Sequence, residues 1–194
     1  NIDIFEVINA AKTKPFGFQA FYPGPGLGGH CIPIDPFILS WKAKKFNFET
    51  KFIQLSGKIN SKMPNYVFKK VKDLLKFNKL RALESLFFII GVSYKKNVDD
   101  LRESPALEFI NLLKKNNFKY IYNDPYVPLL PKTRKFNFNK KSVKITKANL
   151  IKSTVVILIT DHDYYNYKFI KQYSNLIVDC RGRFKKEPGK IILA

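Results

Sequence analysis

The sequence predicts an α/β protein in two parts, a helical part followed by a domain built on a parallel sheet. Apolar residues recur at helical spacing up to about residue 77. From about residue 86, continuous apolar runs of strand length alternate with a helical segment, which is typical of βαβ units and a parallel sheet. We place the boundary near residues 78–85, with the two domains at 1–80 and 84–194.

The first part is predicted to hold three helices around one loop. The first helix spans about residues 1–12, and proline and glycine crowd into the segment 13–36, which predicts a loop. A second helix follows Pro36, a residue that suits the first helical turn. The third helix spans about residues 49–77, with a break or kink expected at Pro64. The apolar positions at helical spacing in the first helix are Ile4, Phe5, Ile8 and Ala11. Phe37, Ile38 and Trp41, with Phe46 as a further candidate, share one face of the second, and Trp41 and the phenylalanines are expected in the core and in interfaces. The buried stripe of the third helix is Ile53, Leu55, Ile59, Val67, Val71, Leu74 and Leu75.

The second part is predicted to form a sheet covered on both faces. Uninterrupted apolar runs are typical of such strands, because neither face meets water. Strands are expected at residues 86–92, 120–122, 154–159 and 176–179. A helix at 104–116 lies between the first two strands, with Ala106, Leu107, Ile110 and Leu113 facing inward.

Polar residues follow three of these strands, at 94–102, 160–162 and 179–181. Parallel sheets bind ligands at the carboxyl ends of their strands, so these clusters are candidate binding residues. Gly91 stands alone after the first strand, without the G-x-G-x-x-G fingerprint of a dinucleotide site. We favour an anion held by Lys95, Arg102 and Arg181, with solvated basic strand ends as an equally weighted alternative.

The chain is strongly basic, with 35 Lys and Arg against 15 Asp and Glu and a net charge of +20. Such an excess suggests a nucleic-acid partner, but it is spread along the sequence. The densest block, residues 132–152, holds eight basic and no acidic side chains and carries no recognition motif. We therefore do not expect nucleic acid as the partner. A non-catalytic basic module that binds RNA or another polyanion remains the alternative function.

The cysteines and the apolar runs indicate where the protein resides. No run has the length of a membrane span, and the first residues resemble the inside of a helix whose beginning lies upstream rather than a signal peptide. Cys31 and Cys180 are far apart, which favours free thiols in a reducing compartment, so we expect a cytoplasmic protein. His30 and His162 form no ligand spacing with either cysteine, and no metal site is expected.

The loop around Cys31 carries the clearest chemistry. Its sequence, FYPGPGLGGHCIPIDP at residues 21–36, combines four glycines, a lone thiol and Asp35. Glycine lets the backbone approach a ligand closely, so the N–H groups of Gly24, Gly26, Gly28 and Gly29 are candidates to face a bound anion, against the alternative of a tight turn. Cys31 is a candidate nucleophile, against the alternative of a small buried apolar residue.

Two segments of the chain resemble a known family. The run GGHCIPID at residues 28–35 is similar to the active-site motif of the UDP-glucose/GDP-mannose dehydrogenases, and GVSYKKNVDDLRESP at 91–105 is similar to the segment that opens their UDP-binding domain. The resemblance covers essentially the whole chain. It implies oxidation of the C6 alcohol of a nucleotide sugar to an acid with two NAD⁺. Within the family, residues 10–36 resemble the branch that acts on UDP-N-acetylhexosamines, first the N-acetylglucosamine 6-dehydrogenases and second the N-acetylmannosamine dehydrogenases.

The resemblance also implies roles for single residues. Cys31 is expected to form a thiohemiacetal and then a thioester with the substrate, and Asp35 to orient water or a catalytic amine. Tyr22, the four loop glycines, Lys95 and Arg181 are expected to bind the UDP-sugar, with Arg102 a weaker candidate. The sheet domain is then a Rossmann-like UDP-binding domain.

The resemblance implies what else the activity needs. Family members begin with an NAD-binding domain and a catalytic lysine, and both are expected upstream of Asn1. We therefore expect a C-terminal portion that binds substrate and carries the nucleophile but is inactive alone. Family members dimerise through a long central helix, so residues 49–77 are expected to carry homodimer contacts.

Overall fold

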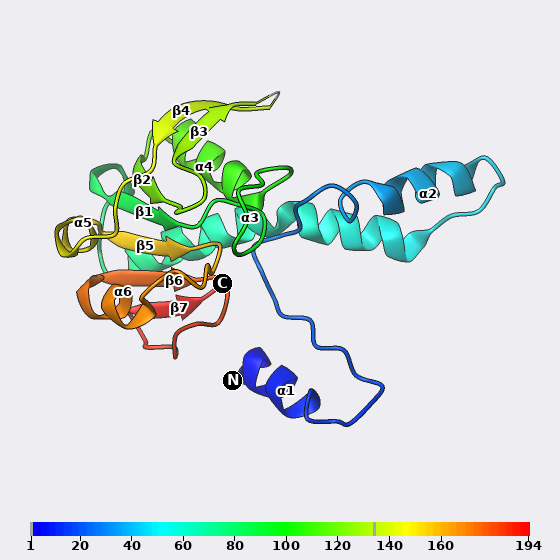
Figure 1. Cartoon of the computed structure of the whole chain (residues 1–194), viewed down its shortest axis with the longest axis horizontal. Helices are drawn as coiled ribbons and strands as arrows, with labels where there is room; N and C mark the ends of the chain where they lie inside the picture. The colour runs from blue at the N-terminus through cyan, green and yellow to red at the C-terminus, as the bar shows by residue number, and fades with distance from the viewer. Residues whose placement is uncertain (1, 134) are drawn as a thin grey trace.

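The core of the protein is a parallel sheet, as predicted. The computed structural model describes residues 2–133 and 135–194. Within that part the sheet has five strands in the order β2-β1-β5-β6-β7, all parallel (Figure 1). The strands are β1 (Leu86–Ile90), β2 (Lys119–Asn123), β5 (Val155–Leu158), β6 (Leu176–Asp179) and β7 (Ile191–Leu193).

The apolar strands are buried on both faces. Along β1, Phe87 and Ile89 point into one hydrophobic cluster and Phe88 and Ile90 into the other, because successive side chains of a strand alternate between faces. All four are fully buried. This two-sided burial is the physical reason why the strands read as unbroken apolar runs.

Two helices cover the first face of the sheet. They are α3 (Lys51–Phe77) and α4 (Pro105–Lys115). Ser104 caps α4, since its side chain accepts a hydrogen bond from the Ala106 N–H, and Pro105 occupies the first turn. The second face is covered by the short helices α5 (Lys147–Lys152) and α6 (Tyr167–Tyr173), which bury Leu150 and Ile170.

The predicted buried stripe of α3 is correct only in its second half. Val67, Val71, Leu74 and Leu75 join the cluster under the sheet. The expectation of burial for Leu55 and Ile59 is wrong, since each is 53% exposed. In this first half α3 packs against helix α2 (Asp35–Lys44) instead of the sheet. The side of α3 that faces away from α2 has no neighbour within the described residues.

Helix α3 runs through Pro64 without interruption, so the expected break is absent from it. Proline has no N–H, which leaves the carbonyl of Asn60, four residues earlier, without its helical partner. Gly26 lies beside that carbonyl: a Cβ added at Gly26 would sit 3.4 Å from the Asn60 oxygen. The proline therefore lies where the glycine loop meets the helix.

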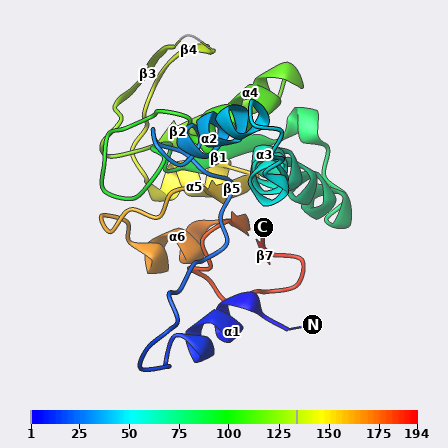
Figure 2. The ribbon, with the colours of Figure 1, turned by 90° about the vertical axis from the view of Figure 1, so that its right-hand side faces the viewer.

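The N-terminal helices lie outside the sheet domain, at two different places. Helix α2 (Asp35–Lys44) and the first half of α3 project together from the sheet, while α1 (Ile4–Ala11) lies near the β6–β7 end, where Phe5 contacts Gly182 (Figures 1 and 2). Burial of the apolar side of α2 was wrongly expected. Ile38 and Trp41 are more than half exposed, and Phe46 lies beyond the helix end.

Several short elements were not predicted. They are the hairpin of β3 (Leu129–Lys132) and β4 (Asn137–Lys141), the helices α5 and α6, the 3₁₀ turn Ala82–Glu84 and strand β7. Each is too brief or too polar to give a clear periodic signal. Among the described helices, none is both long and apolar enough to span a membrane.

Candidate active site

The strand order reverses at the point where parallel sheets bind ligands, at the carboxyl ends of the strands. The chain leaves β1 for β2 on one side and later returns to β5 on the other, so the order reverses between β1 and β5. The loops that follow β1, β5 and β6 meet at this edge. They contain the three polar clusters singled out in the sequence.

The loop after β1, residues 91–104, begins at a glycine that protein atoms surround. Gly91 has a φ of +78°, and a Cβ there would collide with the backbone carbonyl of Thr160. Its N–H donates to the Asn123 carbonyl at 2.9 Å. Thr160 therefore packs closely against this turn, which also lacks the further glycines that bring the backbone of a dinucleotide site close to the pyrophosphate.

The Cys31 loop packs directly on this second loop. The Gly29 N–H donates to the Arg102 carbonyl at 2.8 Å, with a φ of +95° at Gly29. A Cβ at Gly28 would lie 2.5 Å from the Tyr94 Cβ, and one at Gly29 would lie 2.9 Å from the Tyr94 ring. The paired glycines thus allow a close approach between the two predicted motifs.

Cys31 itself is exposed at the start of a helix. Its carbonyl accepts hydrogen bonds from the N–H groups of Ile34 and Asp35, at 3.0 and 2.8 Å. Asp35 is the first residue of α2, where a carboxylate interacts favourably with the helix dipole. Within residues 2–133 and 135–194, neither side chain forms a hydrogen bond to the other or to a third group. The structure leaves the thiol accessible and the carboxylate solvated.

The second thiol has the opposite environment. Cys180 follows β6 and is completely buried, and burial raises the pKa of its thiol to about 12. A thiolate is the nucleophilic form of cysteine, so Cys180 is inert near neutral pH. The two cysteines therefore differ in reactivity because Cys31 is exposed to solvent and Cys180 is not.

Arg181 is held against the Cys31 loop from the β6 edge. Its Nε donates to the Ile159 carbonyl at 2.7 Å, and its guanidinium lies beside Gly24, where an added Cβ would be 2.8 Å from Nη1. Its backbone N–H donates to the Asp179 carboxylate at 2.8 Å. Burial raises the pKa of Asp179, against the lowering effect of the backbone N–H groups of Arg181 and Phe184. The structure thus brings Arg181 and Gly24 together.

The other two basic candidates lie on the loop after β1. The Arg102 guanidinium forms a fork with Asp100, with Nη2–Oδ2 and Nε–Oδ2 distances of 2.7 and 2.9 Å. This pairing lowers the pKa of the Asp100 carboxyl. Lys95 is exposed, with Nζ 5.5 Å from the Tyr94 ring centroid, and no ion pair to it occurs among the described residues. Lys95 is therefore more available to an anion than Arg102.

Tyr22 lies between the loop and α1. Its hydroxyl donates to Asn9 Oδ1 at 3.1 Å and accepts from Lys12 Nζ at 3.2 Å, and its ring stacks near Phe5. Gly26 lies further along the loop against Pro105 and Asn60. The structure thus brings Gly24 against Arg181, and Gly28 and Gly29 against the loop that carries Lys95 and Arg102. The contacts of Tyr22 are instead with the first helix.

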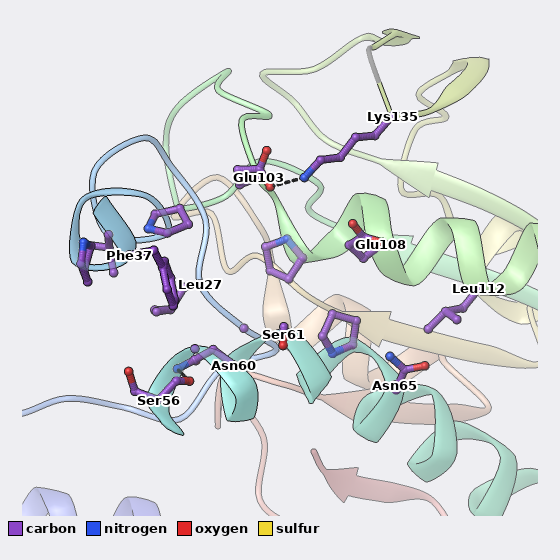
Figure 3. A pocket seen from close by; sticks show the side chains of 17 residues that line it. Leu27, Phe37, Ser56, Asn60, Ser61, Asn65, Glu103, Glu108, Leu112 and Lys135 are labelled. Carbon is purple, nitrogen blue, oxygen red and sulfur yellow. Dashed lines mark hydrogen bonds and ion pairs between the residues drawn. The ribbon is translucent and has the colours of Figure 1, made fainter. Parts of the chain in front are cut away.

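A cavity of about 380 Å³ lies on the other side of the Cys31 loop, between α3 and α4. Figure 3 shows Asn60, Ser61 and Asn65 of α3 facing Glu108 of α4, with the Lys135–Glu103 ion pair at its rim. Of the predicted site residues, Gly26 alone lines it within the described chain. The cavity also contacts Leu27, Ile32 and Glu103, so it adjoins the glycine loop and the loop after β1.

Sequence reasoning missed a buried polar cluster at the same edge of the sheet. His162, Asp124 and Ser93 are each at most 1% exposed. His162 Nε2 lies 3.0 Å from Asp124 Oδ2 and 3.3 Å from Ser93 Oγ. Each residue follows a different strand. Sequence reasoning included His162 in the strand-end cluster 160–162 but did not connect it with Ser93 and Asp124, which follow two other strands.

Comparison with known families accounts for both halves of the chain. A family model described as "UDP-glucose/GDP-mannose dehydrogenase family, UDP binding domain" matches residues 88–186, and the central-domain model of the same family matches residues 1–62. The two matches contain the two motifs that carried the resemblance.

Curated relatives give the same result. The chain is similar to a UDP-N-acetyl-D-mannosamine dehydrogenase of Methanocaldococcus jannaschii, with 31% identity over 99% of this chain and 39% of the relative. It is also similar to an NDP-N-acetyl-D-galactosaminuronic acid dehydrogenase of Ralstonia nicotianae, with 28% identity over 93% of this chain and 40% of the relative. The chain thus spans about 40% of the length of the curated relatives it matches.

A solved structure has the same arrangement of elements. The UDP-D-ManNAc dehydrogenase of Pyrococcus horikoshii is similar with a TM-score of 0.80 and 26% identity, over 99% of this chain and 43% of that one. The sequence models, the relatives and the parallel-sheet fold agree, so the chain belongs to the UDP-glucose/GDP-mannose dehydrogenase family.

Proposed function

We propose that the chain is the substrate-binding and nucleophile-bearing part of an enzyme that oxidises the C6 alcohol of a UDP-N-acetylhexosamine to the uronic acid. The observation that supports this most is the packing of the Cys31 loop on the loop after β1, through the Gly29–Arg102 hydrogen bond. That packing joins the loop of the accessible thiol to the loop that carries Lys95 and Arg102. Family membership favours this function over a polyanion-binding module.

The UDP moiety is proposed to bind along the carboxyl edge of the sheet. Arg181 supplies a planar fork that matches phosphate oxygens, and its Nε bond to the Ile159 carbonyl fixes the direction of the guanidinium. Lys95 supplies a second positive charge, and within the described residues no carboxylate forms a direct ion pair with it. Tyr22 and Gly24 line the approach to Arg181, and Gly28 and Gly29 the approach to Lys95. Arg102 is the weakest candidate, because Asp100 already pairs with its guanidinium.

Cys31 is proposed to act on the sugar carbon. Its thiolate Sγ adds to the C6 carbon of the aldehyde, the C=O bond opens, and its oxygen takes a proton to give a thiohemiacetal. This addition changes no oxidation state and needs no other reactant. Hydrolysis of a later thioester releases the acid and restores the thiol. Asp35, four residues along at the start of α2, is proposed to orient the water or a catalytic amine.

The oxidation steps need a hydride acceptor. The family is NAD-dependent in general. The described residues of this chain do not fit NAD, because Gly91 stands without a glycine-rich turn and Thr160 packs closely against it. We therefore assign no hydride transfer to this chain and propose that other residues of the complete enzyme bind the cofactor.

The substrate is proposed at the level of a UDP-N-acetylhexosamine. The relatives named above are a mannosamine and a galactosaminuronic acid dehydrogenase. The N-acetylglucosamine epimer, favoured by residues 10–36, stays a prediction. Homodimer contacts along the exposed half of α3 likewise stay a prediction.

Calorimetric titration tests the ligand class. The chain is titrated with UDP-N-acetylglucosamine, UDP-N-acetylmannosamine, UDP and a single-stranded RNA oligomer. Saturable binding of UDP and the sugars at physiological salt is expected. Binding of RNA alone, weakening steeply with salt, would support the polyanion module and contradict the dehydrogenase proposal.

Alkylation tests the nucleophile. Iodoacetamide is expected to modify Cys31 well before Cys180, since Cys31 is exposed and Cys180 is buried. A UDP-sugar is expected to slow modification of Cys31. The C180S variant serves as the matched control, because it leaves Cys31 as the single thiol. Labelling of Cys31 that a saturating UDP-sugar leaves unchanged argues against the proposed role.

A further inference from the structure

A buried histidine lies beneath the loop that presents Lys95. His162 follows β5 and is 0% exposed, between the aromatic rings of Tyr126 and Tyr165. The mechanism proposed above does not use it. A buried polar side chain needs hydrogen-bond partners, and each ring nitrogen of His162 has one.

The two ring nitrogens have different roles. Nδ1 accepts a hydrogen bond from the backbone N–H of Asn97 at 2.8 Å, so Nδ1 carries no proton. The proton is then on Nε2, which faces Asp124 Oδ2 at 3.0 Å. This assignment follows from the donors around the ring, since a backbone N–H can only donate. His162 is therefore neutral, a donor on one side and an acceptor on the other.

The donor side ties His162 to the start of the loop. Asp124 Oδ2 also accepts from the backbone N–H groups of Val92 and Ser93, at 2.7 and 3.1 Å. The Ser93 hydroxyl in turn donates to the Lys95 carbonyl at 2.9 Å. The first residues after β1 are thus fixed from below by Asp124.

The acceptor side ties His162 to the tip of the loop. Asn97 has a φ of +61°, a conformation that an L residue rarely adopts without support. Its side chain exchanges two hydrogen bonds with Asp163, Nδ2 to Oδ2 at 2.6 Å and Oδ1 from the backbone N–H at 3.0 Å. The Asp163 pair is exposed, whereas the bond to His162 is part-buried and its acceptor belongs to a ring that is 0% exposed. Because water does not reach the His162 ring, its Nδ1 depends on the Asn97 N–H for a hydrogen-bond partner.

We propose that His162 is a positioning residue, whose Nδ1 acceptor tethers the segment 93–103 and thereby sets where Lys95 and the Arg102 carbonyl lie. The Arg102 carbonyl holds Gly29, so the same tether supports the glycine loop next to Cys31. The part that concerns Lys95 and ligand binding rests on the proposed function. The part that concerns the loop stands on geometry alone.

Two conservative variants separate the two sides of the ring. In H162N the amide oxygen takes a position near that of Nδ1 and can still accept from Asn97, whereas in H162Q the amide nitrogen lies near the place of Nε2 and can still donate to Asp124. A merely space-filling role predicts similar effects of the two variants. A tether through Nδ1 predicts that only H162Q releases the loop.

Hydrogen exchange followed by mass spectrometry on the whole chain measures how firmly the loop is held, without any ligand. H162Q is expected to speed exchange in peptides covering residues 94–103 by about tenfold, as the loss of one part-buried hydrogen bond allows, while H162N stays within about threefold of the wild type. D163A, which removes the exposed partner of Asn97, is expected to have the smaller effect. Equal exchange in H162Q and the wild type would overturn the tether.

Titration with UDP reads the consequence for binding. About tenfold weaker binding is expected for H162Q and near wild-type binding for H162N. If the wild type binds no UDP, the proposed function fails, while the exchange result still decides the tether. If wild type and H162Q bind UDP equally, the tether has no part in ligand binding.

A measurement on the wild type covers the case in which a variant does not fold. The ¹⁵N chemical shifts of the His162 ring report which nitrogen is protonated. A neutral ring with the proton on Nε2 is expected near pH 7. A proton on Nδ1 in the folded protein would contradict the tether, because Asn97 then has no acceptor.

Discussion

The backbone N–H of Gly29 donates to the carbonyl oxygen of Arg102 at 2.8 Å, and this bond joins the two segments by which the chain resembles its family. The segments lie far apart in the sequence, one before α2 and one after β1. Their contact needs a residue without a side chain, since Gly29 has a φ of +95° and faces the Tyr94 ring. The glycine requirement of the Cys31 loop therefore comes first from packing against protein.

G29A is expected to destabilise the protein and displace the Cys31 loop. A Cβ there would lie 2.9 Å from the Tyr94 ring and would be held at a φ of +95°. Backbone strain of this kind costs about 1–3 kcal/mol, and displacement of the ring adds to it. Urea unfolding followed by circular dichroism measures the loss. Alkylation of Cys31 is expected to lose its protection by UDP-sugar in the same variant.

G17A provides the matched control for strain without contact. Gly17 also has a positive φ, +75°, but a Cβ there would meet no heavy atom within 4 Å. Its cost is expected to be limited to the backbone, about 1 kcal/mol. Equal losses of stability in G17A and G29A would show that contact with Tyr94 contributes nothing.

R181K is expected to weaken UDP binding by about tenfold, because lysine keeps the charge but loses the fork that matches phosphate oxygens. It also loses the Nε bond to the Ile159 carbonyl, which directs the side chain. The neighbouring R183K is the control: Arg183 pairs with Asp161 at 2.5 Å, and its loss is expected to change binding less than about threefold. Calorimetry with UDP measures both. A larger loss in R183K would move the anion site to Arg183.

The parallel sheet was predictable from the sequence because burial on both faces leaves a plain signal. Phe87 to Ile90 are consecutive and all buried, so β1 appears as an unbroken apolar run. Strand β3 contains Pro131, and β4 is polar, so neither gives that signal. The apolar residues of α2 suggested burial within this chain, but they are exposed. An apolar stripe predicts that a helix face is covered, and it does not tell whether the same chain or another one covers it.

The candidate site was predictable only in part. The two motifs identified Cys31 and Lys95, and the polar cluster after the strand at 176–179 identified Arg181; the roles of all three remain predictions. The His162–Asp124 pair joins residues 38 positions apart, and only the order of the strands brings them together. Neither residue has a sequence neighbour that suggests the other. The strand order is a property of the fold that single-sequence patterns do not determine.

D124N is expected to destabilise the protein near neutral pH and to reduce its acid sensitivity. Burial alone would raise the pKa of Asp124, but the hydrogen bond from His162 and those from backbone N–H groups outweigh it, and the folded-state pKa lies below the ordinary value of 3.8. The stabilisation is therefore complete above that ordinary value and is lost as the pH falls through the lower folded-state pKa. An amide leaves buried donors poorly paired, at a cost of about 1–3 kcal/mol.

Unfolding in urea from pH 7 to pH 2 measures this difference. The stability gap between wild type and D124N is expected to shrink as the pH falls below 3.8. A constant gap over that interval would show that Asp124 does not titrate with folding. D163N, at an exposed carboxylate beside the same loop, is expected to change stability little at any pH, because exposed ion pairs contribute little.

Leucines at the two ends of α3 test whether the helix serves two different surfaces. Leu75 is 2% exposed and packs under the sheet, whereas Leu55 is 53% exposed on the projecting half. L75A is expected to cost about 2–5 kcal/mol, through lost burial and a cavity, and L55A less than about 1 kcal/mol at low protein concentration. Urea unfolding at several concentrations measures both. If the projecting half of α3 carries homodimer contacts, the cost of L55A rises with protein concentration, since a dimer stabilises the folded chain by mass action. If the stability cost of L55A does not change with protein concentration, dimerisation through this surface is contradicted, while the role of Leu75 is unaffected.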